Sequence, residues 1–244
     1  MRVAIFGATS AMAQAVARSF AADGVRLVLV ARHPRRLEAI RGDLLVRGAA
    51  AVESRVADLA DLDGLAGLVA EVSAVFGGLD AVLIAHGSLG DQLAGQRDFA
   101  VAVRELTVNL LSPIALLTAL APVMETQGSG TIAVIGSVAG DRGRQSNYLY
   151  GTAKGGLGIF VQGLRHRLAR SGVRVVLVKP GFVDTPMTAA FPKGPLWAKP
   201  EQVARDIRRA MARGSAVLYT PWFWRWIMLI IRLLPDALFL RTRL

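Results

Sequence analysis

Short and almost continuous apolar runs alternate along the chain with longer segments whose apolar residues recur every three or four positions. Uninterrupted apolar runs are typical of strands that are covered on both faces of a parallel sheet. The longer segments have the period of helices that pack one face on a core. The pattern predicts strands at residues 3–6, 27–31, 51–55, 81–85, 131–136, 173–179 and 216–220, and helices at residues 11–22, 34–47, 62–76, 99–126 and 150–171.

The regular alternation of strands and helices predicts the overall architecture. Right-handed strand–helix–strand units build an α/β fold, a single Rossmann-type doubly wound parallel sheet. We expect the strand order 3-2-1-4-5-6-7, with the functional site beyond the carboxyl ends of the strands. The 244 residues suit one domain at residues 1–220, followed by an apolar and basic C-terminal helix at residues 221–244.

Composition narrows the classes of site and compartment. The chain has no cysteine, which excludes disulfides and thiolate metal sites, and its three histidines are scattered. We therefore expect no metal. The apolar run at the N-terminus ends at Gly7 and is too short for a signal peptide. The expected location is cytoplasmic, with the inner face of the membrane as an alternative.

The first predicted strand runs directly into a turn of small residues and then into a helix. Such a turn lets the backbone approach a pyrophosphate, and the helix N-terminus supplies amide donors and a partial positive charge. This sequence predicts a dinucleotide site. The residues of the turn that we expect to contact the cofactor are Gly7, Thr9, Ser10, Ala11 and Met12.

The end of the second predicted strand indicates which dinucleotide binds. Enzymes that use NAD usually place a carboxylate there, whereas this chain has Arg32, Arg35 and Arg36 and no acid. Arg32, assisted by Arg35 or Arg36, is suited to pair with a 2′-phosphate. We therefore expect NADP(H), with NAD(H) as the alternative. Asp58 and the adjoining Leu59 follow the third strand and are placed to contact the adenine.

Three residues after the fourth helix predict acid–base chemistry. Ser137 ends the fifth strand, Tyr150 lies thirteen residues later, and Lys154 shares a helix face with Tyr150. The ammonium of Lys154 is expected to lower the phenol pKa from about 10 toward neutrality. Tyr150 would then exchange a proton with a substrate oxygen that Ser137 orients. Asn109 is expected to hold a water in a proton relay through Lys154.

These motifs resemble the short-chain dehydrogenase/reductase superfamily over residues 1–220. The resemblance implies a Ser-Tyr-Lys triad with an assisting Asn at the four positions just described. The family's three turn glycines correspond to Gly7, Ala11 and Ala13, and its Asn-Ala-Gly corresponds to Ala85-His86-Gly87, where we expect His86 to fill the turn. The remaining cofactor contacts that the resemblance implies are Ala85, Gly87, Pro180, Gly181, Val183 and Thr185.

The segment between Ser137 and Tyr150 resembles a narrower group, the reductases of decaprenylphosphoryl-2-keto-pentose, a lipid-linked sugar. Arg142 and Arg144 lie in this segment, where two interpretations stand equal, namely binding of a substrate phosphate and exposure in a solvated loop. The resemblance implies an NADPH-dependent carbonyl reductase of an amphipathic or lipid-linked keto substrate. The alternatives are a reductase of long-chain 3-keto bases or 3-oxoacyl groups and a non-catalytic dinucleotide-binding scaffold.

The C-terminal residues 222–235 combine tryptophans, aliphatic residues and arginines. The apolar stretch is too short to span a bilayer, so we expect a helix that lies on an anionic membrane surface or docks on the body or a partner. Arg241 and Arg243 extend this basic end. The net charge of the chain is +11. Its basic C-terminal residues are interleaved with aliphatic residues, which disfavours nucleic acid as a partner. Gly155, Gly156 and Gly158 predict close helix packing in a dimer or tetramer.

Overall fold

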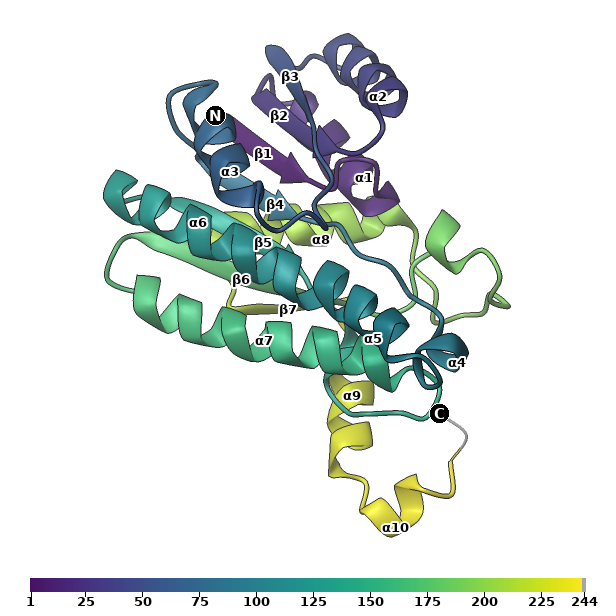
Figure 1. The fold of residues 1–244 in the computed structure, drawn as a ribbon. Helices are drawn as coiled ribbons and strands as arrows, with labels where there is room; N and C mark the ends of the chain where they lie inside the picture. Colours follow the sequence, from purple (N-terminus) through teal and green to yellow (C-terminus); the bar gives the residue numbers. More distant parts are fainter. Residues whose placement is uncertain (243–244) are drawn as a thin grey trace.

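The computed structural model describes residues 1–242. Its centre is a parallel seven-stranded sheet with the order β3-β2-β1-β4-β5-β6-β7, which confirms the predicted topology (Figure 1). Every strand pair is parallel, so all carboxyl ends meet at one edge of the sheet. The strands are β1 (Arg2–Phe6), β2 (Arg26–Ala31), β3 (Ala51–Val56), β4 (Ala81–Ile84), β5 (Gly130–Ile135), β6 (Val173–Pro180) and β7 (Val217–Thr220).

Two layers of helices cover the two faces of the sheet, and side chains alternate between them. In β1, Val3 and Ile5 pack with α1, α2 and α8, whereas Ala4 and Phe6 pack with α3, α6 and α7. This alternation explains why the strand is apolar at every position. The bounds of these helices are α1 (Ala11–Ala21), α2 (Pro34–Val46), α3 (Leu65–Ala74), α6 (Ser112–Gln127), α7 (Tyr148–Leu168) and α8 (Pro200–Arg213).

The helix predicted at residues 99–126 is present, but a π-helical turn divides it into two α-helices. It consists of α5 (Phe99–Leu106), a π-helical turn at Thr107–Leu111 and α6. Asn109 lies in this π-helical turn, is fully buried, and contacts Ser88 in the segment that follows β4. By length and composition the run Phe99–Gln127 could cross a membrane, a test that the core helix of a soluble protein also passes. Here α6 buries Leu116, Leu117 and Leu120 in the core.

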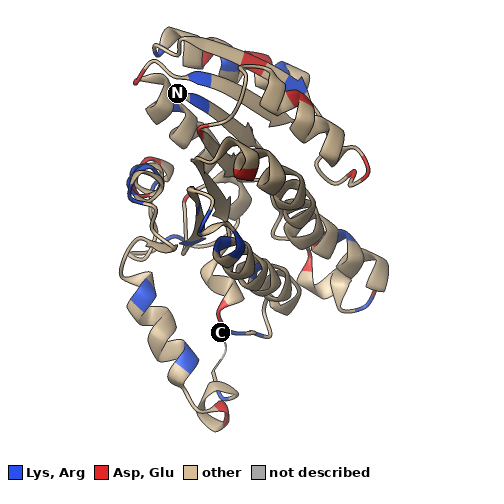
Figure 2. Ribbon diagram, turned by 90° about the vertical axis from the view of Figure 1, so that its left-hand side faces the viewer, with Lys and Arg blue, Asp and Glu red and all other residues tan. Residues whose placement is uncertain are grey.

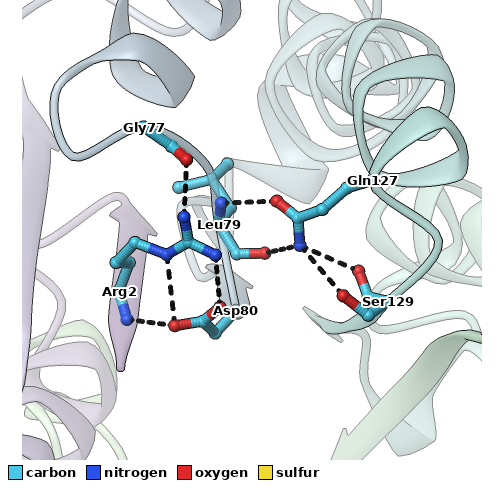
Figure 3. Close-up of polar contacts among 6 residues, drawn as sticks. All are labelled: Arg2, Gly77, Leu79, Asp80, Gln127 and Ser129. Atoms are coloured by element: carbon cyan, nitrogen blue, oxygen red, sulfur yellow. Dashed lines mark hydrogen bonds and ion pairs between the residues drawn. The ribbon is translucent and has the colours of Figure 1, made fainter.

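Polar contacts fasten the opposite edge of the sheet, away from the carboxyl ends (Figure 3). Arg2 donates its backbone N–H and its guanidinium to the carboxylate of Asp80, with Nη2 2.6 Å from Oδ1. The hydrogen bonds from Arg2 hold the pKa of Asp80 below its usual range. Gln127, at the end of α6, pairs with both backbone groups of Leu79. This edge is therefore committed to holding β1, β4 and α6 together.

Helix α8 was not predicted from the sequence, and the C-terminal segment after β7 was predicted as one helix where the structure has two. Helix α8 buries Val203, Ile207 and Met211 at helical spacing, and Pro200 and a left-handed Gly214 mark its two ends. Those signals were readable in the sequence. The tail forms α9 (Trp224–Leu233) and α10 (Asp236–Phe239), and a short α4 (Gln92–Gly95) precedes α5. Arg243 lies outside the described residues.

Candidate active site

Two adjoining cavities lie at the carboxyl edge of the sheet, where the site was expected. The larger, of about 390 Å³, extends from the β1–α1 turn to the end of β2, and the smaller, of about 170 Å³, contains Tyr150 and Lys154. They share Ser10, Met12 and the segment after β4. Together they form one elongated site of the size that dinucleotide and substrate pockets have.

The β1–α1 turn has the geometry that a pyrophosphate requires. Gly7 has a φ of +84°, and a Cβ there would lie 2.5 Å from the backbone nitrogen of His86, so only glycine fits. Ser10 precedes α1 without capping it by its side chain, which leaves the first amides of the helix available. Ala13 is buried in the core, and Ala11 lines the cavity. The two alanines are therefore accommodated.

The far end of the larger cavity is basic. Arg32 and Arg36 both line it, together with Asp58 and Leu59, whereas Arg35 lines neither cavity. Of the two arginines that were predicted to assist Arg32, Arg36 therefore lies at the cavity and Arg35 does not. Asp58 accepts a hydrogen bond from the amide of Ala60 and lies 3.9 Å from the guanidinium of Arg32, which is 63% exposed.

The other predicted cofactor contacts surround these cavities. Those around the larger cavity include the turn residues, and those around the smaller one include the segment that follows β6. Lining one or both cavities are Gly7, Thr9, Ser10, Ala11, Met12, Ala85, Gly87, Tyr150, Lys154, Pro180, Gly181, Val183 and Thr185.

Three of the four predicted catalytic residues line the smaller cavity, namely Ser137, Tyr150 and Lys154. Ser137 lies two residues after the end of β5 and accepts a hydrogen bond from the amide of Ala139. Lys154 reaches across from α7, where its Nζ donates to the carbonyl of Ile135 at 3.1 Å and lies 5.7 Å from the ring centroid of Tyr150. The shared face of α7 therefore places the ammonium of Lys154 and the phenol of Tyr150 at the cavity that Ser137 also lines.

Glycines let α7 press on the turn after Ser137. A Cβ at Gly140 would lie 2.6 Å from the nitrogen of Gly155. A Cβ at Gly156 would lie 3.3 Å from Leu110 Cδ1, which is a tight contact, and one at Gly158 would lie 3.6 Å from Leu177 Cδ2, which is an ordinary one. The close approach predicted from these mid-helix glycines is therefore present within the chain, and it positions Tyr150 and Lys154. It gives no independent evidence of a partner subunit.

Burial dominates the protonation of the site. It raises the pKa of Tyr150 to about 12, a hydrogen bond with Ser137 opposes the rise, and the Glu105 carboxylate adds to it. The predicted lowering toward neutrality is not found in this structure, because burial outweighs the hydrogen bond with Ser137. Burial also lowers the pKa of Lys154 to about 8, and Glu105 offsets part of that. At neutral pH the phenol holds its proton.

Asn109 belongs to a polar network that the sequence analysis described only in part. Its Oδ1 accepts from the amide of Ser88 at 3.2 Å, and its Nδ2 donates to Glu105 Oε2 at 3.0 Å. A Cβ on Gly87 would lie 2.8 Å from Asn109 Oδ1 and 3.5 Å from Lys154 Nζ. Asn109 and Lys154 therefore meet beside Gly87. Glu105 and Ser88 were missed because nothing in their local sequence distinguishes them.

His86, between Ala85 and Gly87 in the turn after β4, lines both cavities. Its Nε2 lies 2.8 Å from the hydroxyl of Ser112, and its buried Nδ1 has no partner among residues 1–242. Burial, with a contribution from Lys154, lowers its pKa to about 3. The ring is therefore neutral, as suits a side chain that fills the turn.

Helix α9 supplies a wall of the smaller cavity, which the sequence analysis did not foresee. Trp224 is 4% exposed and packs with Val138, the neighbour of Ser137, and edge-on to Phe182 at 5.3 Å. A Cβ on Gly181 would lie within 2 Å of the indole. Glycine at position 181 is thus required for this packing. The C-terminal helix α9 therefore packs against the catalytic site.

The two arginines of the segment before Tyr150 have separate roles. Arg142 donates to the carbonyls of Ile231 and Leu234 at 2.5 and 2.6 Å and pairs with Asp236 at 2.6 Å. Its side chain is 14% exposed. The interpretations of Arg142 as a phosphate ligand and as a solvated side chain are therefore both wrong, because it fastens α9 and α10. Arg144, by contrast, lines the smaller cavity.

The outward face of α9 is exposed and mixed in character. Trp226 is 55% exposed and Ile230 64%. Arg225 and Arg232 lie on the exposed side as well, and Figure 2 shows basic positions at intervals along this helix. Trp224 and Met228 face the body. The helix is thus docked through one face and open on the other.

Comparison with known proteins gives a consistent result. The family model for short chain dehydrogenases matches residues 1–195. An uncharacterized oxidoreductase of Mycobacterium tuberculosis is 39% identical over 239 residues, covering 98% of this chain and 96% of the relative. Another from Streptomyces coelicolor is 37% identical over 240 residues, covering 97% and 94%. A crystal structure of an actinorhodin polyketide ketoreductase variant with NADPH has a TM-score of 0.80 at 24% identity, covering 90% and 95%.

Proposed function

Because this chain belongs to the short-chain dehydrogenase/reductase family and is an NAD(P)-dependent oxidoreductase, we propose that it uses NADPH to reduce a keto group of an amphipathic substrate. The observation that carries the proposal is the convergence of Ser137, Tyr150 and Lys154 on the cavity that adjoins the β1–α1 turn. Nicotinamide, when bound, supplies the hydride. The acid–base work falls to the side chains of the chain itself.

Tyr150 is the proton donor in this proposal. Its phenol remains protonated at neutral pH, since burial raises its pKa to about 12, and it can donate to the carbonyl oxygen as that oxygen gains charge. Ser137 donates a hydrogen bond to the same oxygen. The Lys154 ammonium stabilises the phenolate that remains. Asn109, next to Lys154, is suited to hold the water that returns the proton.

The basic end of the larger cavity supports NADPH over NADH. Arg32 and Arg36 offer guanidinium groups to a 2′-phosphate, and β2 ends without the carboxylate that would bind ribose hydroxyls. Asp58 lies close to Arg32 but caps its own turn and is half exposed. A 2′-phosphate would meet more positive than negative charge at this end.

Apolar walls around Tyr150 support an amphipathic substrate. Phe182, Phe191, Met187 and Trp224 line the smaller cavity. A lipid-linked keto sugar suits a cavity with such walls and a nearby arginine, whereas a lipid ketone needs the walls alone. A dinucleotide-binding scaffold of no catalytic activity has no need of the convergent Ser137, Tyr150 and Lys154.

We propose further that the outward face of α9 rests on an anionic membrane. Exposed tryptophans, aliphatic side chains and arginines are the combination that interfacial helices use. The cavity wall and this face belong to the same helix, so an amphipathic substrate would enter close to the bilayer. The cytoplasmic location with attachment to the inner face remains part of the proposal.

A homo-oligomer completes the proposal. Along α5, the π-helical turn and α7, Val103, Leu111 and Ile159 are exposed by 41%, 44% and 73%. Apolar side chains gathered on neighbouring helices favour burial in a dimer or tetramer. Light scattering at micromolar concentration tests this, and a strictly monomeric mass would contradict it.

The direct test of the function is a substrate screen with NADPH and NADH in parallel. Lipid-linked 2-keto sugars, 3-keto long-chain bases and 3-oxoacyl compounds are offered to the purified chain, and consumption of reduced nicotinamide is followed. Turnover of a lipid-linked sugar supports the first choice, and turnover of simple lipid ketones alone supports the second. Binding of NADPH with no turnover of any ketone would favour the scaffold.

A further inference from the structure

Arg144 is a charged side chain at the cavity of Tyr150 whose guanidinium has no partner among residues 1–242. Its side chain is partly buried and lines the smaller cavity. Its guanidinium makes no ion pair or hydrogen bond with any of residues 1–242, and its Nε is buried without a partner. Burial lowers the pKa of the group but leaves it charged. A charge held in this way is costly unless a ligand meets it.

The nearby carboxylates already have other partners, and Glu105 accepts hydrogen bonds from Ser88 and Asn109. Asp141 is bound by Lys179 and by the hydroxyl of Tyr219, with Tyr219 Oη 2.8 Å from Oδ2. Asp236 pairs with Arg142, and Asp184 pairs with Lys193 at 2.6 Å. The positive charge of Arg144 is therefore uncompensated on this side of the molecule.

Two further polar atoms around the same cavity lack partners among the described residues. Trp224 is almost wholly buried and its Nε1 is unpaired, and the Oδ1 of Asn147 is also buried and unpaired. Buried polar atoms are hydrogen bonded in the great majority of cases. With the Nδ1 of His86, four exceptions at one cavity indicate a polar ligand, and the guanidinium determines its charge.

We infer that Arg144, with Trp224 and Asn147, forms a subsite for an anionic oxygen group of the substrate, a phosphate ester or a carboxylate. The inference rests on the proposed function, since the subsite adjoins Tyr150. The anionic group would bind Arg144 while the reacting carbonyl meets Tyr150 and Ser137. Phe182 and Phe191 leave apolar surface for the rest of the molecule. The substrate class is thus an anionic keto compound with an apolar part.

Binding measured without turnover tests the subsite. Dihydroxyacetone phosphate and neutral dihydroxyacetone, and likewise acetoacetate and its ethyl ester, are titrated calorimetrically into the protein saturated with NADP⁺. We expect the anionic member of a pair to bind more tightly, and Arg144→Leu to weaken it by about tenfold or more while the neutral member changes less than about threefold. The pair that shows the difference identifies phosphate or carboxylate.

Three variants keep the result interpretable. Arg144→Lys retains the charge and should keep part of the preference. Arg170→Leu removes an exposed arginine at the far end of α7 and should match the wild type. Trp224→Phe removes the indole N–H but keeps an aromatic ring, and it should weaken the anionic member more than the neutral one. Thermal melting of each variant shows whether it is folded.

The outcomes separate the subsite from the reaction. Equal binding of anionic and neutral members, or equal losses in Arg144→Leu and Arg170→Leu, overturns the subsite even if the enzyme reduces ketones. Selective binding of the anion with no reduction of any keto compound leaves the subsite standing and refutes the proposed function.

Discussion

The two ends of the active site are built in different ways. At the cofactor end, a glycine turn, a helix N-terminus and strand ends present mainly backbone groups, all from residues that lie within the matched family model. At the substrate end, the wall includes Trp224, which lies beyond residue 195 and reaches the cavity only because Arg142 and Gly181 hold its helix there. The first end follows from the fold, and the second depends on side chains far apart in the sequence.

The difference explains how a general fold carries a particular specificity. A backbone cradle tolerates Ala11 and Ala13 in place of glycines, since small side chains still leave room. The substrate wall has no such tolerance at Gly181, where the indole of Trp224 occupies the space of a side chain. Changes at the substrate end should therefore alter ketone use without altering cofactor binding, and the reverse should hold at the cofactor end.

The largest effect is expected where the two ends meet. Tyr150→Phe removes the proton donor and almost no volume, so turnover should fall by about 10²–10⁴ while NADPH binding, followed by its fluorescence, stays within a few-fold. Tyr148→Phe, on the same helix and 41% exposed, is the matched control and should behave as the wild type. A Tyr150→Phe enzyme with a tenth of the normal rate would exclude this residue as the donor.

The second effect concerns the substrate end alone. Trp224→Ala removes a buried indole and should cost about 3–5 kcal/mol in the free energy of unfolding, measured by urea denaturation. In the folded variant the KM for the ketone should rise and the affinity for NADPH should stay unchanged. Trp222→Ala, which removes a side chain that is 72% exposed, should cost less than about 0.5 kcal/mol. Similar costs for the two would mean that α9 is not docked as described.

The sequence predicted these two ends unequally, for a physical reason. Periodicity and turn chemistry are local, so the strand order, the Gly7 turn and the shared face of Tyr150 and Lys154 could be predicted. The position of Trp224 and the bonds of Arg142 to the tail span about ninety residues, and no local pattern encodes them. The pKa of Tyr150 was predicted to fall, whereas burial raises it, because burial is a property of the whole fold that no local pattern encodes.

The third effect concerns the cofactor end alone. Arg32→Ala should weaken NADPH by about 1.5–3 kcal/mol, or about ten- to a hundredfold, because one charged hydrogen bond to the 2′-phosphate is lost. NADH binding should hardly change. Arg35→Ala is the matched control, since Arg35 lines neither cavity, and Arg36→Ala should have an intermediate effect. Equal losses for NADPH and NADH would remove the 2′-phosphate from the proposal, and ketone KM should be unaffected throughout.

The smallest effect concerns the open face of α9. Each basic residue near an anionic surface contributes about 1 kcal/mol, so Arg225→Gln or Arg232→Gln should each weaken co-sedimentation with anionic vesicles about fivefold. Added salt should weaken the wild type, because the attraction is screened within a Debye length. Arg170→Gln is the control for net charge. Since Trp224 and Met228 hold the inner face, neither α9 variant should change NADPH affinity or the unfolding midpoint. A wild type that ignores anionic vesicles at low salt would leave α9 as a wall of the substrate cavity and nothing more.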